Sequence, residues 1–197
     1  ALVDSLLDKV DGLLVGGGMA FTFLTALGHD VGCSLLERDR IEAARRVLDR
    51  ARARGITVRL PVDVVAATGV DAASGRTVSV REIPRDLMGL DIGDGTVSQF
   101  AAALKSAATI VWNGPMGVFE KPPFAAGTLG VARAVAGSGA FSVIGGGDTI
   151  AAVQATAGSV RLAQADGPRG NIDDAITLLF HFANGALGCV HTVWSRD

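Results

Sequence analysis

Three glycines, an aspartate and a threonine follow one another at Gly145–Thr149, directly after the apolar run Phe141–Ile144. Glycines carry no side chain that would keep an anion from the backbone amides, and the amides at the start of a helix carry partial positive charge. Asp148 would repel phosphate unless a divalent cation bridged its carboxylate and the phosphate oxygens, so the loop favours a magnesium nucleotide. The alternative interpretation is a tight strand-to-helix turn in which Asp148 is the N-cap.

A second run of glycines, Gly16–Gly18, separates the apolar Val15 from the amphipathic stretch Met19–Leu27. Without side chains, the backbone at Gly17 and Gly18 could let a flat ring or a ribose rest against it. The run contains no acid, however, and glycines between a strand and a helix commonly serve only close packing of the two. Taken alone, this second loop therefore favours packing over binding.

A third loop, Trp112–Glu120, follows a predicted buried strand and combines apolar with polar side chains. Pro115 and Val118 offer apolar surface, while Asn113 and Glu120 place polar groups at the two ends. An adenosine has the same mixture, because its base is apolar and its ribose diol can donate hydrogen bonds to a carboxylate. The loop therefore predicts a nucleoside site, and the alternative is a surface turn with Glu120 at the start of a helix.

Nucleophilic and metal-centred chemistries find less support in the sequence. Cys33 and Cys189 lie far apart with no Cys-x-x-Cys spacing, which argues against a disulfide framework and against a zinc site. Cys189 and His191 share one face of a predicted strand. The favoured interpretation is that this face belongs to the core of the sheet and is not a site. The motif Gly-x-x-x-x-Gly-Lys-Ser/Thr is absent, and no lysine lies in a glycine loop. Phosphoryl transfer needs cationic groups next to the phosphoryl group that moves. The sequence therefore resembles only part of a phosphotransferase, with the cationic groups missing.

The overall composition is that of a globular chain. Hydrophobic residues make up 49% of the 197 residues and charged residues 19%, and the formal net charge is -2. This balance argues against disorder, and it provides neither the basic surface that attracts nucleic acid nor a patch for anionic lipid. No apolar run approaches the roughly 20 residues of a membrane helix. We therefore expect a cytoplasmic protein without nucleic-acid or membrane partners, and the first residues, which lack an initiator Met, suggest a piece of a longer protein.

Short apolar runs alternate with amphipathic stretches from Asp11 to Gly158, a pattern typical of an α/β fold with a mostly parallel sheet. The expected strands are nearly continuously apolar, as in strands covered on both faces, and comprise Gly12–Val15, Ile56–Leu60, Ala108–Trp112 and Ala140–Ile144. The expected helices connect them and comprise Met19–Leu27, Glu37–Arg54, Thr96–Ala107, Phe124–Ala136 and Asp148–Ala155. Together these elements predict an open three-layer sandwich.

The segment Asp63–Arg81 departs from this rhythm. Its two runs, Val62–Ala67 and Arg76–Arg81, flank Ser74-Gly75 and are typical of strands joined by a turn. We expect a small antiparallel excursion there, at one edge of the sheet.

The end of the chain predicts an antiparallel hairpin. Asn184-Gly185, a pair that favours a type I′ turn, joins the apolar runs Asp174–Ala183 and Ala186–Trp194. A two-residue turn determines which side chains share a face of the hairpin. One face would then consist of Leu178, Phe180, Phe182, Leu187, Cys189 and His191.

At its glycine loops the sequence closely resembles the C-terminal, nucleotide-binding domain of the phosphoglycerate kinase family. The motifs that carry the resemblance occur in the family's order: Gly16–Leu24, Leu60–Asp63, Met88–Gly93, Trp112–Glu120, Phe124 with Gly127-Thr128, and Gly145–Thr149. The resemblance covers residues 1–157 and implies an incomplete, Rossmann-like domain that binds Mg-ADP or Mg-ATP. In the full-length family, ATP and 3-phosphoglycerate give ADP and 1,3-bisphosphoglycerate.

Carried over to this chain, the resemblance implies a role for each loop. The residues implied to lie against the adenine are Gly17, Gly18, Leu90, Pro115 and Val118. The residues implied near the ribose and phosphates are Glu120 for the ribose and Asn113, Gly146, Gly147 and Thr149 for the phosphates. Asp148 would bind the magnesium ion, and the amide of Gly147 would stabilise the phosphoryl group in flight.

The sequence also departs from the family. The N-terminal domain that holds phosphoglycerate and the Gly-Gly-Ala-Lys segment are absent, so we expect the chain to be inactive by itself and to meet 3-phosphoglycerate only together with that domain. After Gly93 the family has Pro where this chain has Asp94, and we expect Thr96 to cap the helix that follows.

Residues 158–197 resemble another family, the C-terminal sheet domain of glucose-fructose oxidoreductase-like, NAD-dependent dehydrogenases. The match consists of the Asp173-Asp174 start, the alternating strand and Asn184–Gly188. A join of two families implies a chimera whose hairpin serves structure, by adding strands or by pairing two chains as a homodimer. The leading hypothesis is therefore a nucleotide-binding α/β domain. The alternatives are a non-enzymatic chimera with a structural or dimerising hairpin and a fragment of an NAD-dependent oxidoreductase.

Overall fold

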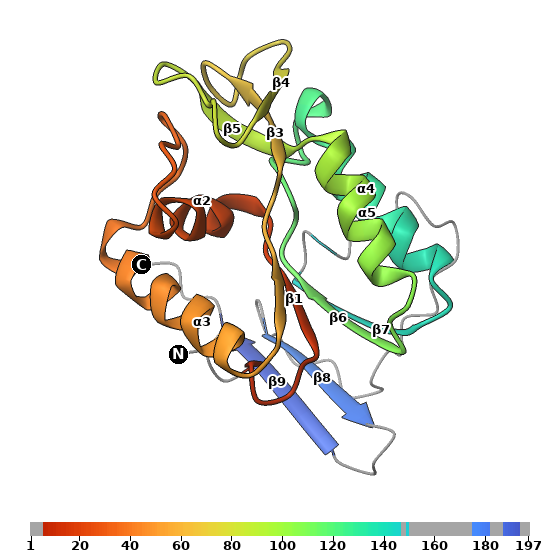
Figure 1. The fold of residues 1–197 in the computed structure, drawn as a ribbon. Coiled ribbons are helices and arrows are strands. Elements are labelled where there is room, and N and C mark those ends of the chain that lie inside the picture. The colour runs from red at the N-terminus through yellow and green to blue at the C-terminus, as the bar shows by residue number, and fades with distance from the viewer. Residues whose placement is uncertain (1–5, 147–148, 150–174, 182–186, 194–197) are drawn as a thin grey trace.

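A computed structural model describes residues 6–146, 149, 175–181 and 187–193. Two pairs of parallel strands form the middle of the fold (Figure 1). The pairs are β1 (Gly12–Leu14) with β2 (Thr57–Arg59) and β6 (Thr109–Asn113) with β7 (Phe141–Gly145). All four strands occur where the apolar runs predicted them. Leu14 of β1 packs against the core around Trp112 of β6, which brings the two pairs together.

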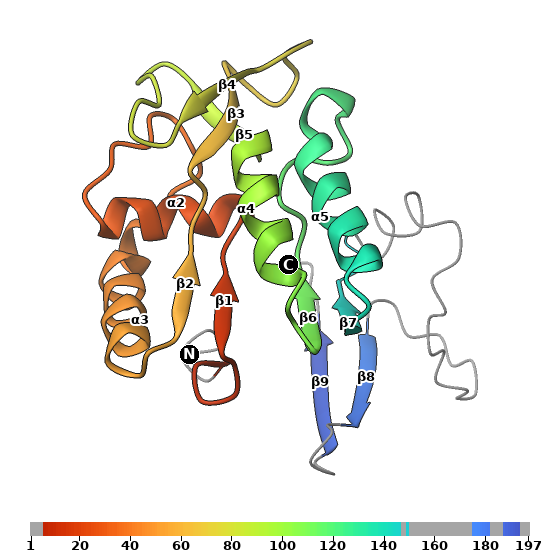
Figure 2. The ribbon, with the colours of Figure 1, turned by 45° about the vertical axis from the view of Figure 1, so that its right-hand side comes forward.

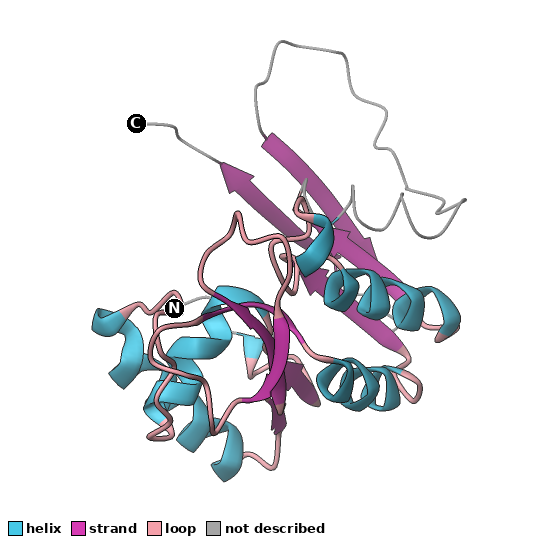
Figure 3. Ribbon diagram, turned by 90° about the horizontal axis from the view of Figure 1, so that it is seen from above, coloured by secondary structure: helices cyan, strands magenta, loops and turns pink. Residues whose placement is uncertain are grey.

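Two pairs of helices flank these strands. The first pair is α2 (Gly17–Ala26) with α3 (Ile41–Ala53), which the 3-10 helix η1 (Arg38–Arg40) precedes. The second pair is α4 (Asp94–Leu104) with α5 (Ala126–Gly137), which η2 (Pro122–Phe124) precedes. Figures 1 and 3 show the two pairs on opposite sides of the central strands, so the predicted three-layer α/β fold is confirmed. Among the described helices, none is both long and apolar enough to cross a membrane.

Each helix pair buries its apolar side against the strands. In the α4–α5 half, Phe100 is fully buried in one cluster with Trp112 and Val131. In the other half, α3 turns Val47 inward and its arginines outward, as the amphipathic pattern predicted. Gly55 has φ +70° directly after the last turn of α3, and this left-handed residue ends the helix.

A three-stranded antiparallel sheet, in the order β4-β3-β5, lies beyond one end of the parallel strands (Figure 1). Its strands are β3 (Asp63–Ala67), β4 (Arg76–Ser79) and β5 (Met88–Ile92). The predicted excursion is confirmed as β3 and β4, but its place at an edge of the parallel sheet is wrong, because these strands form a separate sheet in the described part of the chain. β5 is absent from the expected strands because a glycine and an aspartate interrupt its apolar pattern.

Figure 2 shows β6 and β7 side by side, next to the ends of α4 and α5. The burial of these two strands differs from expectation. Ile110 and Trp112 are buried, whereas Val111 between them is 58% exposed. Phe141 at the start of β7 is 58% exposed as well. The expectation that these strands are covered on both faces is therefore wrong for β6 and for the start of β7.

α4 is capped from the neighbouring sheet. The helix begins at Asp94 with Gly93 as its N-cap, so the expectation that Thr96 caps it is wrong. Asp63 of β3 has this role, because its Oδ1 accepts a hydrogen bond from Thr96 N at 2.7 Å and its Oδ2 accepts one from Gly95 N at 2.9 Å. The Thr96 hydroxyl donates to the same aspartate and is fully buried.

The predicted hairpin is present as β8 (Ala175–His181) and β9 (Leu187–Val193), which pair antiparallel. His181 pairs with Leu187, so five positions, 182–186, separate the paired ends instead of a two-residue turn. The register is therefore shifted by one residue from the predicted one.

This shift changes which residues share a face. Leu178 pairs with Val190 and Phe180 with Gly188, so the predicted face that joined Leu178 and Phe180 to Cys189 is wrong. The turn residues Asn184-Gly185 lie outside the described residues, as does all of the predicted helix Asp148–Ala155 except Thr149.

Candidate nucleotide site

The glycine run Gly16–Gly18 lies where β1 ends and α2 begins. Gly17 has φ +60°, a conformation that glycine adopts at low cost. A Cβ at Gly17 would lie 2.8 Å from the carbonyl oxygen of Pro115, and a Cβ at Gly16 would clash with the sulfur of Met116. The glycines therefore let the start of α2 lie close to the loop after β6, which brings two of the three predicted loops into contact.

Hydrogen bonds hold the loop after β6 at several points. Trp112 Nε1 donates to the carbonyl oxygen of Gly114 at 2.8 Å, and Gly114 itself has φ +94°. The amide of Gly114 donates to Thr149 Oγ1 at 3.0 Å, and the amide of Met116 donates to Thr128 Oγ1 at 3.0 Å. Both threonines are fully buried. The loop is thus tied to α5 on one side and to the loop after β7 on the other.

The glycine loop after β7 lies beside the end of β6. Gly146 has φ +85°, and a Cβ there would lie 3.3 Å from Asn113 Oδ1 and 3.4 Å from Thr149 Oγ1. Asn113 is exposed and follows Trp112 in β6, which pairs in parallel with β7. The carboxyl ends of two adjacent parallel strands therefore place an exposed amide side chain next to the predicted phosphate loop.

Two of the predicted adenine residues belong to one apolar cluster. Leu90 of β5 is buried, Val118 is half-buried, and both pack with the fully buried Phe124. The amide of Val118 donates to the carbonyl oxygen of Leu90 at 2.8 Å, so backbone as well as side chains joins the loop to β5. Glu120, two residues further on, is exposed.

A buried carboxyl lies behind this loop. Asp91 of β5 is only 3% exposed, and its oxygens accept hydrogen bonds from Gly127 N at 2.7 Å and from Ile92 N at 2.9 Å. Burial raises the pKa of Asp91 to about 6, and the two amide hydrogen bonds oppose the rise. Sequence reasoning gave this residue no role, although an acid between Leu90 and Ile92 in an apolar stretch signals a buried carboxyl.

The structure brings together residues from all three loops. Gly17 and Pro115 are in contact, Gly146 lies beside Asn113, and Thr149 holds Gly114. A Cβ at Gly18 would lie 2.7 Å from the side chain of Leu35, a neighbour that sequence reasoning did not identify. Gly147 and Asp148 lie outside the described residues, so their predicted roles stay predictions. Within the described part, no group of three His, Cys, Asp or Glu side chains is placed to hold a metal ion.

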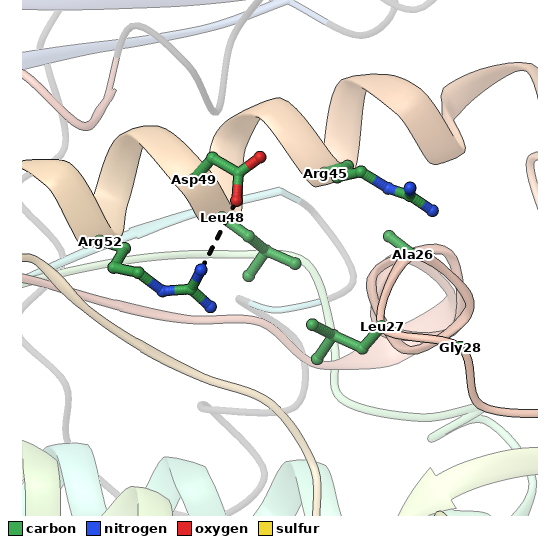
Figure 4. A pocket seen from close by; sticks show the side chains of 7 residues that line it. All are labelled: Ala26, Leu27, Gly28, Arg45, Leu48, Asp49 and Arg52. Atoms are coloured by element: carbon green, nitrogen blue, oxygen red, sulfur yellow. Dashed lines mark ion pairs between the residues drawn. The ribbon is translucent and has the colours of Figure 1, made fainter.

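A pocket of about 390 Å³ lies elsewhere, between the end of α2 and the outer side of α3 (Figure 4). Its lining residues are Ala26, Leu27, Gly28, Arg45, Leu48, Asp49 and Arg52. Arg52 and Asp49 form an ion pair of 3.7 Å there, and both side chains are largely exposed. None of the predicted site residues lines this pocket.

Comparison with known proteins gives the same family that the sequence motifs resemble. The sequence model of the family described as phosphoglycerate kinase matches residues 1–162. Phosphoglycerate kinase from Thermus thermophilus is 56% identical over a match that covers 77% of this chain and 40% of that protein. Phosphoglycerate kinase from Salinispora arenicola is 57% identical over a match that covers 79% of this chain and 38% of that protein.

Two solved structures show the same fold. Phosphoglycerate kinase from Coxiella burnetii matches 79% of this chain with a TM-score of 0.76 and 42% identity, and the match covers 41% of that chain. The enzyme from Pyrococcus horikoshii OT3 matches 78% of this chain with a TM-score of 0.66 and 32% identity. The chain thus spans about two fifths of the length of the relatives that it matches. With the family's sequence and fold shared over most of its length, the chain belongs to the phosphoglycerate kinase family.

Proposed function

We propose that this chain binds Mg-ADP or Mg-ATP as the nucleotide-binding part of a phosphoglycerate kinase. The observation that carries the proposal is the convergence of the loops after β1, β6 and β7. Gly17 lies against Pro115, and Gly146 lies against Asn113. Open parallel sheets bind their ligands at the carboxyl ends of the strands, where these loops lie. Family membership supports the same assignment.

In this proposal each loop contacts a different part of the nucleotide. The apolar side chains of Pro115 and Val118 would receive the adenine, with the buried Leu90 in the same cluster as Val118 and the glycine backbone at Gly17 and Gly18 against the other side of the ring. The exposed carboxylate of Glu120 suits the ribose diol, because a carboxylate accepts hydrogen bonds from hydroxyl groups.

The loop after β7 would hold the phosphates. Gly146 places no side chain beside the exposed Asn113, and the side-chain amide nitrogen of Asn113 can donate a hydrogen bond to a phosphate oxygen. In the same proposal, Gly147 and Thr149 also contact phosphate, and Asp148 supplies a carboxylate oxygen to Mg²⁺, which prefers oxygen ligands and keeps phosphate oxygens among them. When bound, the magnesium ion neutralises charge on the phosphates. The amide of Gly147 would donate to the moving phosphoryl group.

The full reaction transfers the terminal phosphoryl group of ATP to the carboxylate of 3-phosphoglycerate and leaves ADP and 1,3-bisphosphoglycerate. We propose that this chain does not complete the reaction by itself, because it spans about two fifths of the length of the relatives that it matches and no lysine lies in a glycine loop of its sequence. A coupled assay of ATP formation from 1,3-bisphosphoglycerate should therefore show no turnover with the isolated chain. Turnover at the rate of a complete family member would overturn this part of the proposal.

Calorimetric titration of Mg-ADP into the full chain tests the binding proposal directly. Asp148→Ala and Gly147→Leu should each weaken binding by about tenfold or more, the first by removing a metal ligand and the second by filling the phosphate site. Asp49→Ala, in the exposed pocket on α3, is the matched control and should bind as the wild type does. Absence of binding by the wild type, or equal binding by all four proteins, would contradict the assignment.

For the end of the chain we propose a boundary between a kinase-like part, residues 1–157, and a tail of different origin, residues 158–197. The family match stops at residue 162, close to this boundary. A homodimer through the tail stays a prediction. Sedimentation with and without residues 158–197 tests it, since loss of a dimer without loss of the fold would support a dimerising tail.

A further inference from the structure

Asp91 contacts two segments that the proposed site needs. It lies in β5 directly after Leu90, and its side chain faces inward, with 3% of the residue exposed. Its Oδ2 accepts a hydrogen bond from Gly127 N at 2.7 Å, across 36 positions of sequence. No hydrogen bond joins it to a charged side chain within the described residues. The carboxyl group therefore makes its hydrogen bonds with backbone amides, which is the arrangement of a structural anchor.

The first contact is with the start of α5. This helix has Ala125 at its N-cap, no side-chain cap of its own and no acid in its first turn. Asp91 supplies what is missing, because a carboxylate near the first amides satisfies a free donor and interacts favourably with the positive helix end. Thr128 in the same turn holds the amide of Met116 at 3.0 Å, so the position of the helix start is transmitted to the loop after β6.

The second contact is with that loop itself. A Cβ at Gly117 would clash with Asp91 Oδ1, so the loop backbone lies directly against the carboxyl group. The next residue, Val118, donates its amide to the carbonyl oxygen of Leu90 at 2.8 Å. The segment between Met116 and Val118 is thus held by α5 on one side and by β5 on the other, with Asp91 between them.

We propose that Asp91 is a positioning residue for the nucleoside loop, by which we mean the loop Trp112–Glu120 after β6. Asp91 fixes the backbone of Gly117–Val118 and the start of α5 in the arrangement that an adenosine requires. The inference rests on the proposed function, since it concerns the same loop. Asp91 does not touch the nucleotide, because it is buried behind the loop. It acts through the backbone of Gly117 and through Thr128.

Asp63 provides a matched control. It caps α4 from β3 as Asp91 caps α5 from β5, with hydrogen bonds from Thr96 N at 2.7 Å and Gly95 N at 2.9 Å. Its side-chain hydrogen bonds go to the start of α4 and not to the loop after β6. Loss of either carboxyl should weaken the fold, but only loss of Asp91 should disturb the loop.

The first measurement needs no ligand. Amide hydrogen exchange of Met116 and Val118 is followed by NMR in the full chain, the Asp91→Ala variant and the Asp63→Ala variant, under conditions where each is folded. Relative to amides in β6, exchange at these two positions should speed up about tenfold in Asp91→Ala and stay unchanged in Asp63→Ala. Equal exchange in the two variants would overturn the inference.

The second measurement is the dissociation constant for adenosine and for Mg-ADP. We expect both constants to rise about tenfold in Asp91→Ala, the effect of losing a charge-assisted hydrogen bond, and to be unchanged in Asp63→Ala. Asp91→Asn keeps the shape and one acceptor, so it should restore at least part of the affinity, and it replaces the alanine variant if that variant does not fold. Wild-type affinity in Asp91→Ala would show a merely structural role and overturn the inference. Absence of binding by the wild type would instead overturn the proposed function, while hydrogen exchange still decides whether Asp91 holds the loop.

Discussion

Replacing Asp91 by Asn should change how the stability of the chain depends on pH. Burial raises the pKa of Asp91 from 3.8 to about 6, against the opposing hydrogen bonds from Gly127 and Ile92. A carboxyl whose pKa is higher in the folded chain holds its proton more tightly there than in the unfolded chain. Its contribution to the free energy of unfolding is therefore most favourable below the unfolded pKa, falls as the pH rises toward about 6, and is constant above that value.

The size of the effect follows from the two pKa values. They differ by about 2 units, and each unit corresponds to about 1.4 kcal/mol, so ionisation of Asp91 lowers the free energy of unfolding by about 3 kcal/mol. The asparagine variant has nearly the same shape and no proton to lose. The difference in unfolding free energy between wild type and Asp91→Asn should therefore shift by about 2 kcal/mol between about pH 4 and about pH 7, in favour of the variant at the higher pH, because part of the change already occurs below pH 4.

Urea denaturation followed by circular dichroism measures this difference at each pH. Subtracting the two proteins removes the titration of the other groups, which both contain. Val111→Thr, a change at an exposed position that adds and removes no ionisable group, is the control and should follow the wild type with a constant offset. Parallel curves for wild type and Asp91→Asn across this range would refute the claim that burial raises the pKa of Asp91.

Three further changes test the packing of the fold and of the loops. Phe100→Ala should lower the free energy of unfolding by about 3–5 kcal/mol in urea denaturation, because the ring is fully buried between α4, α5 and β6. Gly17→Ala should lower the free energy of unfolding by about 1–3 kcal/mol and raise the dissociation constant for Mg-ADP. The reason is that φ is +60° at this position and the new methyl group would lie 2.8 Å from Pro115 O. Unchanged stability and binding would show that the loop moves to make room for the methyl group. Val111→Thr should alter stability by less than about 0.5 kcal/mol, because the side chain is 58% exposed, and a large loss would mean that this face is covered.

Local pattern was sufficient to predict most of the elements. The strands β1, β2, β6 and β7 fall in short runs rich in apolar and β-branched residues, and α3 has a clear amphipathic stripe, so each is recognisable without its neighbours. The three glycine-rich loops were found for the same reason. A glycine with φ +60° at position 17 or +85° at position 146 meets a local backbone requirement, which the sequence displays directly.

Elements that depend on distant partners were harder to predict. β5 contains a glycine and an aspartate that make a poor strand pattern, and it forms because β3 pairs with it. The hairpin of β8 and β9 was found, but its register was wrong by one residue, since an Asn-Gly pair favours a two-residue turn without enforcing one.

The sequence by itself determined the α/β order of elements, the family and the three loops, because composition, periodicity and glycine positions are properties of short segments. Only the tertiary structure decided that Pro115 meets Gly17, that Asp63 rather than Thr96 caps α4, and that Asp91 lies against Gly117 and accepts a hydrogen bond from Gly127 N. These contacts join residues more than 25 positions apart. They exist only after the strands and helices have packed. The residues next to Asp91 in the sequence therefore do not reveal that its carboxyl group will accept a hydrogen bond from Gly127 N.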